Sequence, residues 1–144
     1  MKMSLESLCR REIVCVDVNT VVLEATEMME EMNVGSVVVI QNDRPVGIVT
    51  DRDVVLRVVN KKLDPAKCVV GDIMSLEVVT LKQNTGLYDA LEQIKESGSR
   101  VRRFPIVDEN GAIKGIITLD DVIYILGREM SDVASIIESE RPRL

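Results

Sequence analysis

The chain has 144 residues, of which 46% are apolar and only 2% aromatic, and its formal net charge is -6. This length suits one compact domain, or two half-size units that share a core. The acidic balance argues against binding nucleic acid by bulk electrostatics, and no apolar run approaches the ~18 residues that span a bilayer, which argues against a membrane protein.

The residue types needed for most catalytic and metal sites are missing or scattered. The sequence has no histidine, and its three cysteines, Cys9, Cys15 and Cys68, do not have metal-ligand spacing. We find no glycine-rich phosphate loop and no nucleophile with a neighbouring base, so we predict no catalytic residue, no metal and no enzymatic activity. Reduced thiols and the lack of an apolar signal segment in residues 1–11 predict a cytoplasmic protein.

The first half of the chain alternates between strand and helix patterns. A short apolar strand over residues 13–16 leads to Thr20, whose hydroxyl can cap a helix with one apolar face. Two strands joined by a turn follow, over residues 36–40 and 46–50, and a second helix begins near Asp51. A polar connector over residues 61–67 separates this half from the next.

The second half has the same order of elements. They are a strand at 78–81, a helix capped by Thr85, strands at 104–107 and 113–118, and a helix from Leu119. Residues 128–144 are charged and predict a helical tail that frays at Arg141-Pro142.

Matching motifs show that the two halves are an internal repeat. Gly47-Ile48-Val49-Thr50-Asp51-Arg52-Asp53-Val54 corresponds to Gly115-Ile116-Ile117-Thr118-Leu119-Asp120-Asp121-Val122, and Thr20 with Ala25 corresponds to Thr85 with Ala90. We therefore predict an α/β (α+β) protein of two β-α-β-β-α repeats, packed sheet to sheet about a pseudo-twofold axis with two clefts between them. The expected boundaries are 5–60 for the first repeat, 61–67 for the linker, 68–130 for the second repeat and 131–144 for the tail.

The repeat that ends in Gly-apolar-x-Thr-x-x-Asp resembles the cystathionine-β-synthase (CBS) domain. Further matches are Gly71-Asp72-Ile73-Met74 before the second copy and Arg103-Phe104-Pro105-Ile106-Val107-Asp108 within it. The resemblance covers about residues 5–130 and implies a tandem pair, or Bateman module. Such modules bind AMP, ATP, related adenosine nucleotides or S-adenosylmethionine in clefts between the repeats.

Several expectations about ligand and partners follow from this resemblance. We expect an adenosine nucleotide, AMP first, as a regulatory ligand rather than a catalytic cofactor. The resemblance also implies a disc-like homodimer and a separate effector protein of unknown identity. The competing hypothesis is a structural or protein-interaction module that dimerises and binds no nucleotide.

The candidate residues suit the parts of such a ligand. One carboxylate, Asp53 or Asp121, can accept hydrogen bonds from both ribose hydroxyls. Thr50 or Thr118, with the free N–H groups of the helix that follows, can hold a phosphate. The alternative for both threonine-aspartate pairs is ordinary helix capping, for which these residue types are well suited.

The resemblance also predicts which residues share a cleft. By their matching positions, Thr20 and Ala25 should face Thr118 and Asp121, and Thr85 and Ala90 should face Thr50 and Asp53. Basic residues at the positions of Arg102 and Arg103 reach phosphates in related modules. Arg52 is replaced by Asp120 in the second copy, so we expect the Arg52 cleft to fill first and the Asp120 cleft to disfavour polyphosphates.

Overall fold

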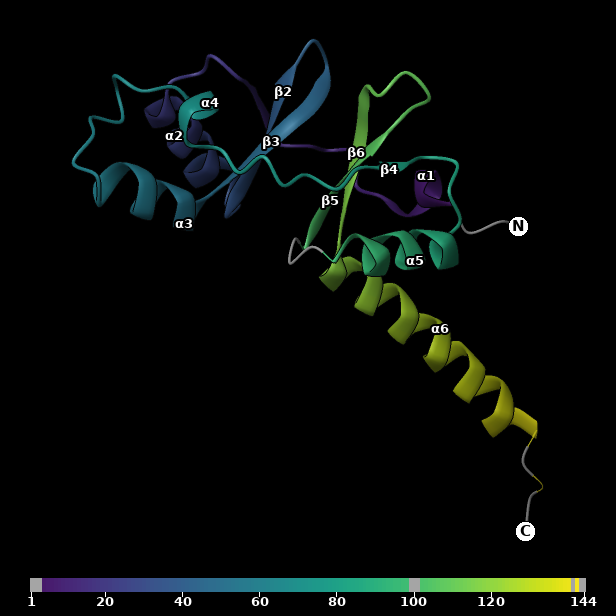
Figure 1. The fold of residues 1–144 in the computed structure, drawn as a ribbon. Coiled ribbons are helices and arrows are strands. Elements are labelled where there is room, and N and C mark those ends of the chain that lie inside the picture. The colour runs from purple at the N-terminus through teal and green to yellow at the C-terminus, as the bar shows by residue number, and fades with distance from the viewer. Residues whose placement is uncertain (1–3, 99–101, 141, 143–144) are drawn as a thin grey trace.

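Each repeat folds into a small three-stranded sheet flanked by helices, in a computed structural model that describes residues 4–98, 102–140 and 142 (Figure 1). The first unit contains β1 (Cys15–Asp17), α2 (Val22–Met32), β2 (Ser36–Gln41), β3 (Arg44–Thr50), α3 (Asp51–Val54) and the π-helical continuation η1 (Val55–Val59). The second contains β4 (Leu81–Lys82), α5 (Leu87–Ser97), β5 (Arg103–Val107), β6 (Ile113–Thr118) and α6 (Leu119–Glu140). The predicted fold class and order of elements are confirmed.

The two sheets have the same topology. In each, the first strand runs parallel to the second, and the second and third strands form an antiparallel hairpin. Ser36 pairs with Thr50 in the first hairpin as Arg103 pairs with Thr118 in the second, so Ser36 and Arg103 are equivalent positions. The first hairpin closes through Asn42 and Asp43, which both have positive φ, as a two-residue hairpin turn requires.

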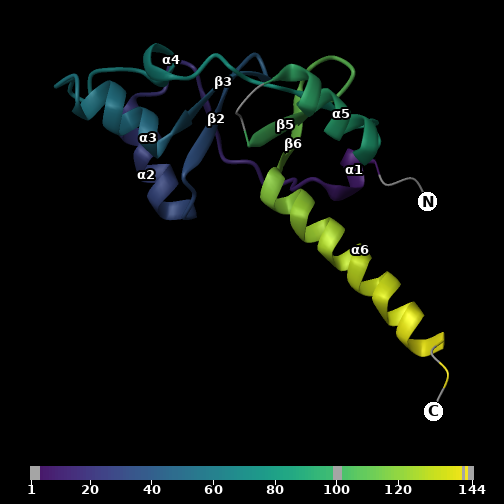
Figure 2. The ribbon, with the colours of Figure 1, turned by 60° about the horizontal axis from the view of Figure 1, so that its bottom comes forward.

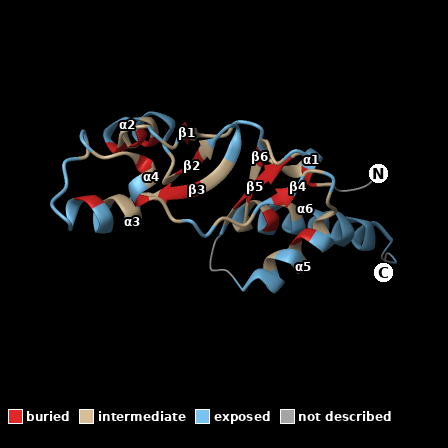
Figure 3. Cartoon of the chain, turned by 45° about the horizontal axis from the view of Figure 1, so that its top comes forward, coloured by how far each residue is buried: buried red, intermediate tan, exposed pale blue. Residues whose placement is uncertain are grey.

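Every sheet has one face against its own helices and one face toward the other sheet. Val37, Val39 and Val49 belong to the core cluster of the first unit. Val38 and Ile48 are also buried, at 2% and 6% exposure, yet they belong to neither core cluster. Because side chains alternate along a strand, these two point away from α2 and toward the second sheet. Figure 3 shows the buried residues gathered in the strands of both sheets.

Contacts between the hairpin turns fix the relative orientation of the two sheets. The backbone N–H of Ile113 donates to the carbonyl of Asp43 at 2.8 Å, beside the first turn. The Arg44 guanidinium lies against Gly111 of the second turn. Both hairpins therefore point the same way, and their open ends, at Thr50 and Thr118, also lie at one end of the molecule.

Two short helices pack beside the residues that precede α2 and α5. One of them packs on the unit that is more distant from it in the sequence. The segment with α4 (Val70–Ile73) packs on the first unit, where Val70 N–H donates to the Thr20 carbonyl at 2.8 Å. The segment with α1 (Leu5–Leu8) precedes the first unit but packs on the second, where Leu5 N–H donates to the Thr85 carbonyl at 2.9 Å. The buried Leu5 is part of the second unit's core cluster.

These crossings correct the predicted helix caps. Neither Thr20 nor Thr85 is an N-cap, because α2 and α5 begin two residues later, behind Val21 and Gly86. No side-chain hydrogen bond caps either helix. The threonines instead offer their backbone carbonyls to the crossing segments.

Helix α6 projects away from both sheets in two views (Figures 1 and 2). It is one helix of 22 residues and continues past the predicted boundary at residue 130. Apolar side chains on it remain largely exposed, including Ile123, Met130 and Ile137. Within the described part of the chain, no helix combines the length and apolar character needed to cross a membrane.

Candidate functional site

The larger of two clefts between the repeats opens around Thr50. This Thr50 cleft has a volume of about 440 Å³ and is lined by Ile48, Thr50, Asp51, Arg52, Asp53, Ser75, Glu77, Arg102 and Arg103. Ile48 to Asp53 come from the end of β3 and the start of α3, whereas Arg102 and Arg103 come from the start of β5. The cleft therefore draws on both repeats. It brings together five predicted site residues, namely Thr50, Arg52, Asp53, Arg102 and Arg103, beside the apolar Ile48.

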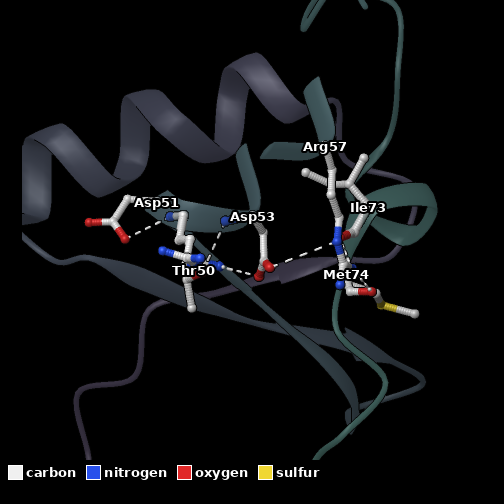
Figure 4. Close-up of polar contacts among 7 residues, drawn as sticks. Thr50, Asp51, Asp53, Arg57, Ile73 and Met74 are labelled. Atoms are coloured by element: carbon white, nitrogen blue, oxygen red, sulfur yellow. Dashed lines mark hydrogen bonds and ion pairs between the residues drawn. The ribbon is translucent and has the colours of Figure 1, made fainter. Parts of the chain in front are cut away.

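Thr50 and Asp53 hold the start of α3 in place. Thr50 Oγ accepts from the Asp53 N–H at 3.1 Å, and Asp53 Oδ2 accepts from the Thr50 N–H at 2.9 Å, which together form a capping box. The other carboxylate oxygen, Oδ1, is 4.0 Å from Arg57 Nε (Figure 4). Arg57 also donates to the carbonyls of Ile73 and Met74, at 2.8 and 3.0 Å. This arginine ties α4 to the helix that carries the site.

A second, smaller cleft opens around Thr118. This Thr118 cleft has a volume of about 280 Å³ and is lined by Arg10, Glu12, Val14, Val34, Gly35, Ser36, Val38, Arg103, Ile116, Thr118 and Asp120. Thr118 and Asp121 form the same reciprocal pair of hydrogen bonds as Thr50 and Asp53, at 3.0 Å each. In this repeat, however, Asp121 Oδ1 accepts from Arg10 Nη2 at 2.7 Å.

The two aspartates therefore differ in how much of the carboxylate is free. Both are mostly buried, with side chains 16% and 14% exposed for Asp53 and Asp121. Asp121 has both oxygens engaged at hydrogen-bond distance, whereas Oδ1 of Asp53 has only the long contact to Arg57. Asp53 also lines its cleft and Asp121 does not line the other one. Of the two, only Asp53 is placed to accept a ligand hydroxyl without losing a short ion pair.

The negative charge of Asp120 affects its surroundings less than the sequence suggests. Its carboxylate is 82% exposed and lies 3.4 Å from Arg102 Nη2. Water screens an exposed charge strongly, and the arginine offsets it further. Asp120 therefore repels an anion in the Thr118 cleft less than its position beside Thr118 implies. The same contact draws Arg102, which lines the Thr50 cleft, toward the Thr118 side.

Besides Asp121, four predicted site residues lie outside both clefts, and the structure does not bring the predicted pairs across the repeats together. Ala25 and Ala90 are 0% and 1% exposed and pack in the two core clusters. Thr20 follows β1, and Thr85 lines a separate hollow near Lys82, both at the turn ends of the hairpins. Thr50 and Thr118 stand at the open ends, so the length of each sheet separates the expected partners.

The sequence reading missed Arg10, Ser75 and Glu77. Ser75 and Glu77 come just after the Gly71-Asp72-Ile73-Met74 motif, and Ser75 pairs with Ile48 through two backbone hydrogen bonds of 2.8 and 3.1 Å. That motif was the available signal for this part of the cleft. Arg10 reaches Asp121 across 111 positions of the chain, and no periodic pattern indicates such a contact. Among the described residues, no group of three or more cysteine, aspartate or glutamate side chains is arranged to hold a metal ion.

Comparison with known proteins gives the family. The CBS domain model matches residues 5–60 and 70–128. The chain is 33% identical over 123 residues to an uncharacterized protein of Methanopyrus kandleri, covering 85% of this chain and 62% of that protein's length. It is 32% identical over 119 residues to the CBS domain-containing protein YhcV of Bacillus subtilis, covering 83% of this chain and 82% of the relative.

A solved structure extends the likeness to the fold. The crystal structure of an uncharacterized conserved protein from Pyrococcus horikoshii superposes with a TM-score of 0.67 and 32% identity, covering 100% of this chain and 96% of that one. The matched ranges coincide with the two three-stranded units and their clefts. The chain therefore belongs to the CBS-domain family, as a tandem pair of CBS repeats.

Proposed function

We propose that this chain is a non-enzymatic regulatory module that binds an adenosine-type ligand, with AMP as the first candidate, in the Thr50 cleft. The observation that carries the proposal is the make-up of this cleft. Thr50 and Asp53 of one repeat line it together with Arg102 and Arg103 of the other. Its volume of about 440 Å³ falls within the ~300–1,000 Å³ of typical small-molecule sites, whereas the 280 Å³ of the Thr118 cleft falls just below.

Each part of a nucleoside monophosphate has a partner in the Thr50 cleft. The Thr50 hydroxyl accepts from Asp53 N–H, and its own hydrogen is still available to a phosphate oxygen. The guanidinium groups of Arg102 and Arg103 suit a phosphate, which they can bind through two parallel hydrogen bonds. Oδ1 of Asp53 can accept from the ribose hydroxyls, and Ile48 offers an apolar surface to the adenine.

The charge of the lining favours a monophosphate over a triphosphate. The cleft has three arginines, at 52, 102 and 103, and three carboxylates, at 51, 53 and 77. The lining is thus formally neutral, and a ligand with two negative charges needs less compensation than one with four. This balance supports AMP rather than ATP as the first ligand to test.

Calorimetric titration of AMP into the purified protein tests the proposal. Asp53→Ala removes the ribose acceptor and should weaken AMP binding in the Thr50 cleft by about 1–3 kcal/mol, the value for a hydrogen bond to a charged group. Asp121→Ala is the matched control, because it removes an equivalent capping box from the other repeat. It should leave AMP binding in the Thr50 cleft unchanged. Wild-type protein that binds none of AMP, ATP, adenosine or S-adenosylmethionine would overturn the proposal.

A structural module without a nucleotide is the second candidate. It is supported by the use of both aspartates in capping boxes, which gives each threonine-aspartate pair a role in stability alone. Native mass spectrometry separates the two candidates, because a bound nucleotide adds its mass to the protein and a structural module shows none.

A homodimer is part of the proposed function under either candidate. Val55 and Val59 of η1 are 54% and 66% exposed, and Ile123 and Tyr124 of α6 are 66% and 67% exposed. Such apolar faces typically mark an interface. We further propose that the dimer acts on a separate effector protein and works in the cytoplasm, for which the three free cysteines are suited.

A further inference from the structure

One arginine, Arg103, lies between the two clefts and lines both of them. It is the first residue of β5, and its neighbours Phe104 and Ile106 belong to the core cluster of the second unit. Phe104 points into that core, so alternation along the strand turns Arg103 the other way, toward the first sheet. Its Nη2 is 3.9 Å from the position that a Cβ would take at Gly35. The guanidinium therefore sits where the open ends of the two hairpins meet.

This guanidinium is partly buried, and within residues 4–98, 102–140 and 142 it forms no hydrogen bond and no ion pair of 4.0 Å or less. Two other arginines of the clefts differ from it. Arg10 pairs with Asp121, and Arg102 with Asp120. Removing a charge from water without pairing it is costly, so an anion that binds at Arg103 recovers an interaction that the protein alone does not supply.

Only the second repeat has an arginine at this position. Ser36, the residue equivalent to Arg103 in the first hairpin, also lines the Thr118 cleft. A symmetric pair of repeats would place one arginine at each of these positions, one for each cleft. Here a single guanidinium is within reach of two sites.

We propose that Arg103 is a shared anion ligand, and that the two clefts therefore bind phosphate-bearing ligands with negative coupling. The first phosphate takes the guanidinium, so the second cleft must bind its phosphate without it. A neutral nucleoside has no phosphate that could bind Arg103, so the two clefts bind it without such coupling. This inference rests on the proposed function, since it concerns how the same clefts fill.

Titration calorimetry with AMP and with adenosine tests the coupling on the 144-residue chain. For wild type we expect two AMP steps, the second weaker by at least about tenfold, as for the loss of one hydrogen bond to a charged group. In Arg103→Met, which keeps a side chain of similar reach without the charge, the first step should weaken by about that factor and the spacing between the two steps should narrow. Adenosine binding should be the same in both proteins. Arg103→Lys, which keeps the charge, should restore part of the separation.

A second variant separates coupling from a built-in difference between the clefts. Asp53→Ala weakens the Thr50 cleft and leaves Arg103 free, so AMP should bind the Thr118 cleft about tenfold more tightly than in the second wild-type step. Two AMP steps that keep their spacing in Arg103→Met, or a Thr118 cleft that is indifferent to Asp53→Ala, would overturn the shared ligand and leave the proposed function standing. Absence of AMP binding to wild type would overturn both. Circular dichroism and thermal melts of each variant establish that it is folded.

Discussion

Alanine at Gly115 should destabilise the second unit, because Gly115 marks a close crossing of two chain segments. The N-terminal segment passes over β6 here, and Arg10 and Ile116 exchange two backbone hydrogen bonds of 2.9 and 3.0 Å. A Cβ at Gly115 would lie 2.5 Å from Cys9 Sγ and 2.9 Å from the Arg10 carbonyl oxygen. A backbone carbonyl cannot move aside as the end of a flexible side chain does. The whole segment would have to shift, and Arg10 with it.

The expected change in the free energy of unfolding is the difference between two contributions. Forcing extra volume into a packed site costs about 1–3 kcal/mol. Replacing glycine by alanine restricts the unfolded chain and returns about 0.4–1 kcal/mol. The crossing is tight and partly backbone, so we expect a net loss of about 1–2 kcal/mol in the free energy of unfolding.

Urea denaturation measures this change, with Gly127→Ala as the matched control. Gly127 lies inside α6, and a Cβ there meets nothing within 4 Å. The same substitution should therefore stabilise the protein by about 0.5–1 kcal/mol, the ordinary gain of alanine over glycine in a helix. A Gly115→Ala protein as stable as wild type would show that the N-terminal segment does not cross β6 as closely as described.

Three further predictions concern assembly, reactivity and the order of filling. Light scattering should give a dimer for wild type and the 16.0 kDa monomer for Ile123→Asp, which places a charge on the exposed apolar face; a wild-type monomer would contradict the proposed interface. Burial raises the pKa of the Cys9 and Cys15 thiols above that of an exposed thiol, so less thiolate is present at pH 8 and both should be alkylated more slowly than free cysteine; equal rates would contradict their burial. Crystals soaked in limiting AMP should show ligand in the Thr50 cleft first, and preferential filling at Thr118 would refute the ranking.

The repeat could be predicted from the sequence because its signals are local. Turn residues such as Asn42-Asp43, and apolar runs bounded by glycine, identify each hairpin without knowledge of the rest of the chain. The same holds for Thr50 and Asp53, whose capping box spans four residues. The first strand of each repeat is shorter than expected, since only Cys15–Asp17 and Leu81–Lys82 pair with a neighbouring strand. Ahead of β1, the Val14 carbonyl still accepts from the Val38 N–H at 3.0 Å.

The errors all involve contacts between segments far apart in the chain. Thr20 and Thr85 look like caps in sequence, but their carbonyls bind the crossing segments and the helices start later. Ala25 has the spacing of a helix face, which indicates burial as readily as ligand contact. The partner of Asp121 was not predictable, because Arg10 reaches it only through the path of the N-terminal segment. Arg103 was predicted as a site residue from its place in the repeat, but its position between two clefts depends on how the sheets meet.

The path of the N-terminal segment also sets the order in which the two units can fold during synthesis. The first unit, with α4, is built from one continuous stretch, so it can form as soon as that stretch has left the ribosome. The second unit needs Leu5, which is synthesised before the first unit and must wait, without its core, until β4 to β6 have been made. The segment with α1 is thus among the last to reach its final place. A nascent chain arrested before β6 would display Leu5 to any chaperone or protease nearby, even with its first unit already folded.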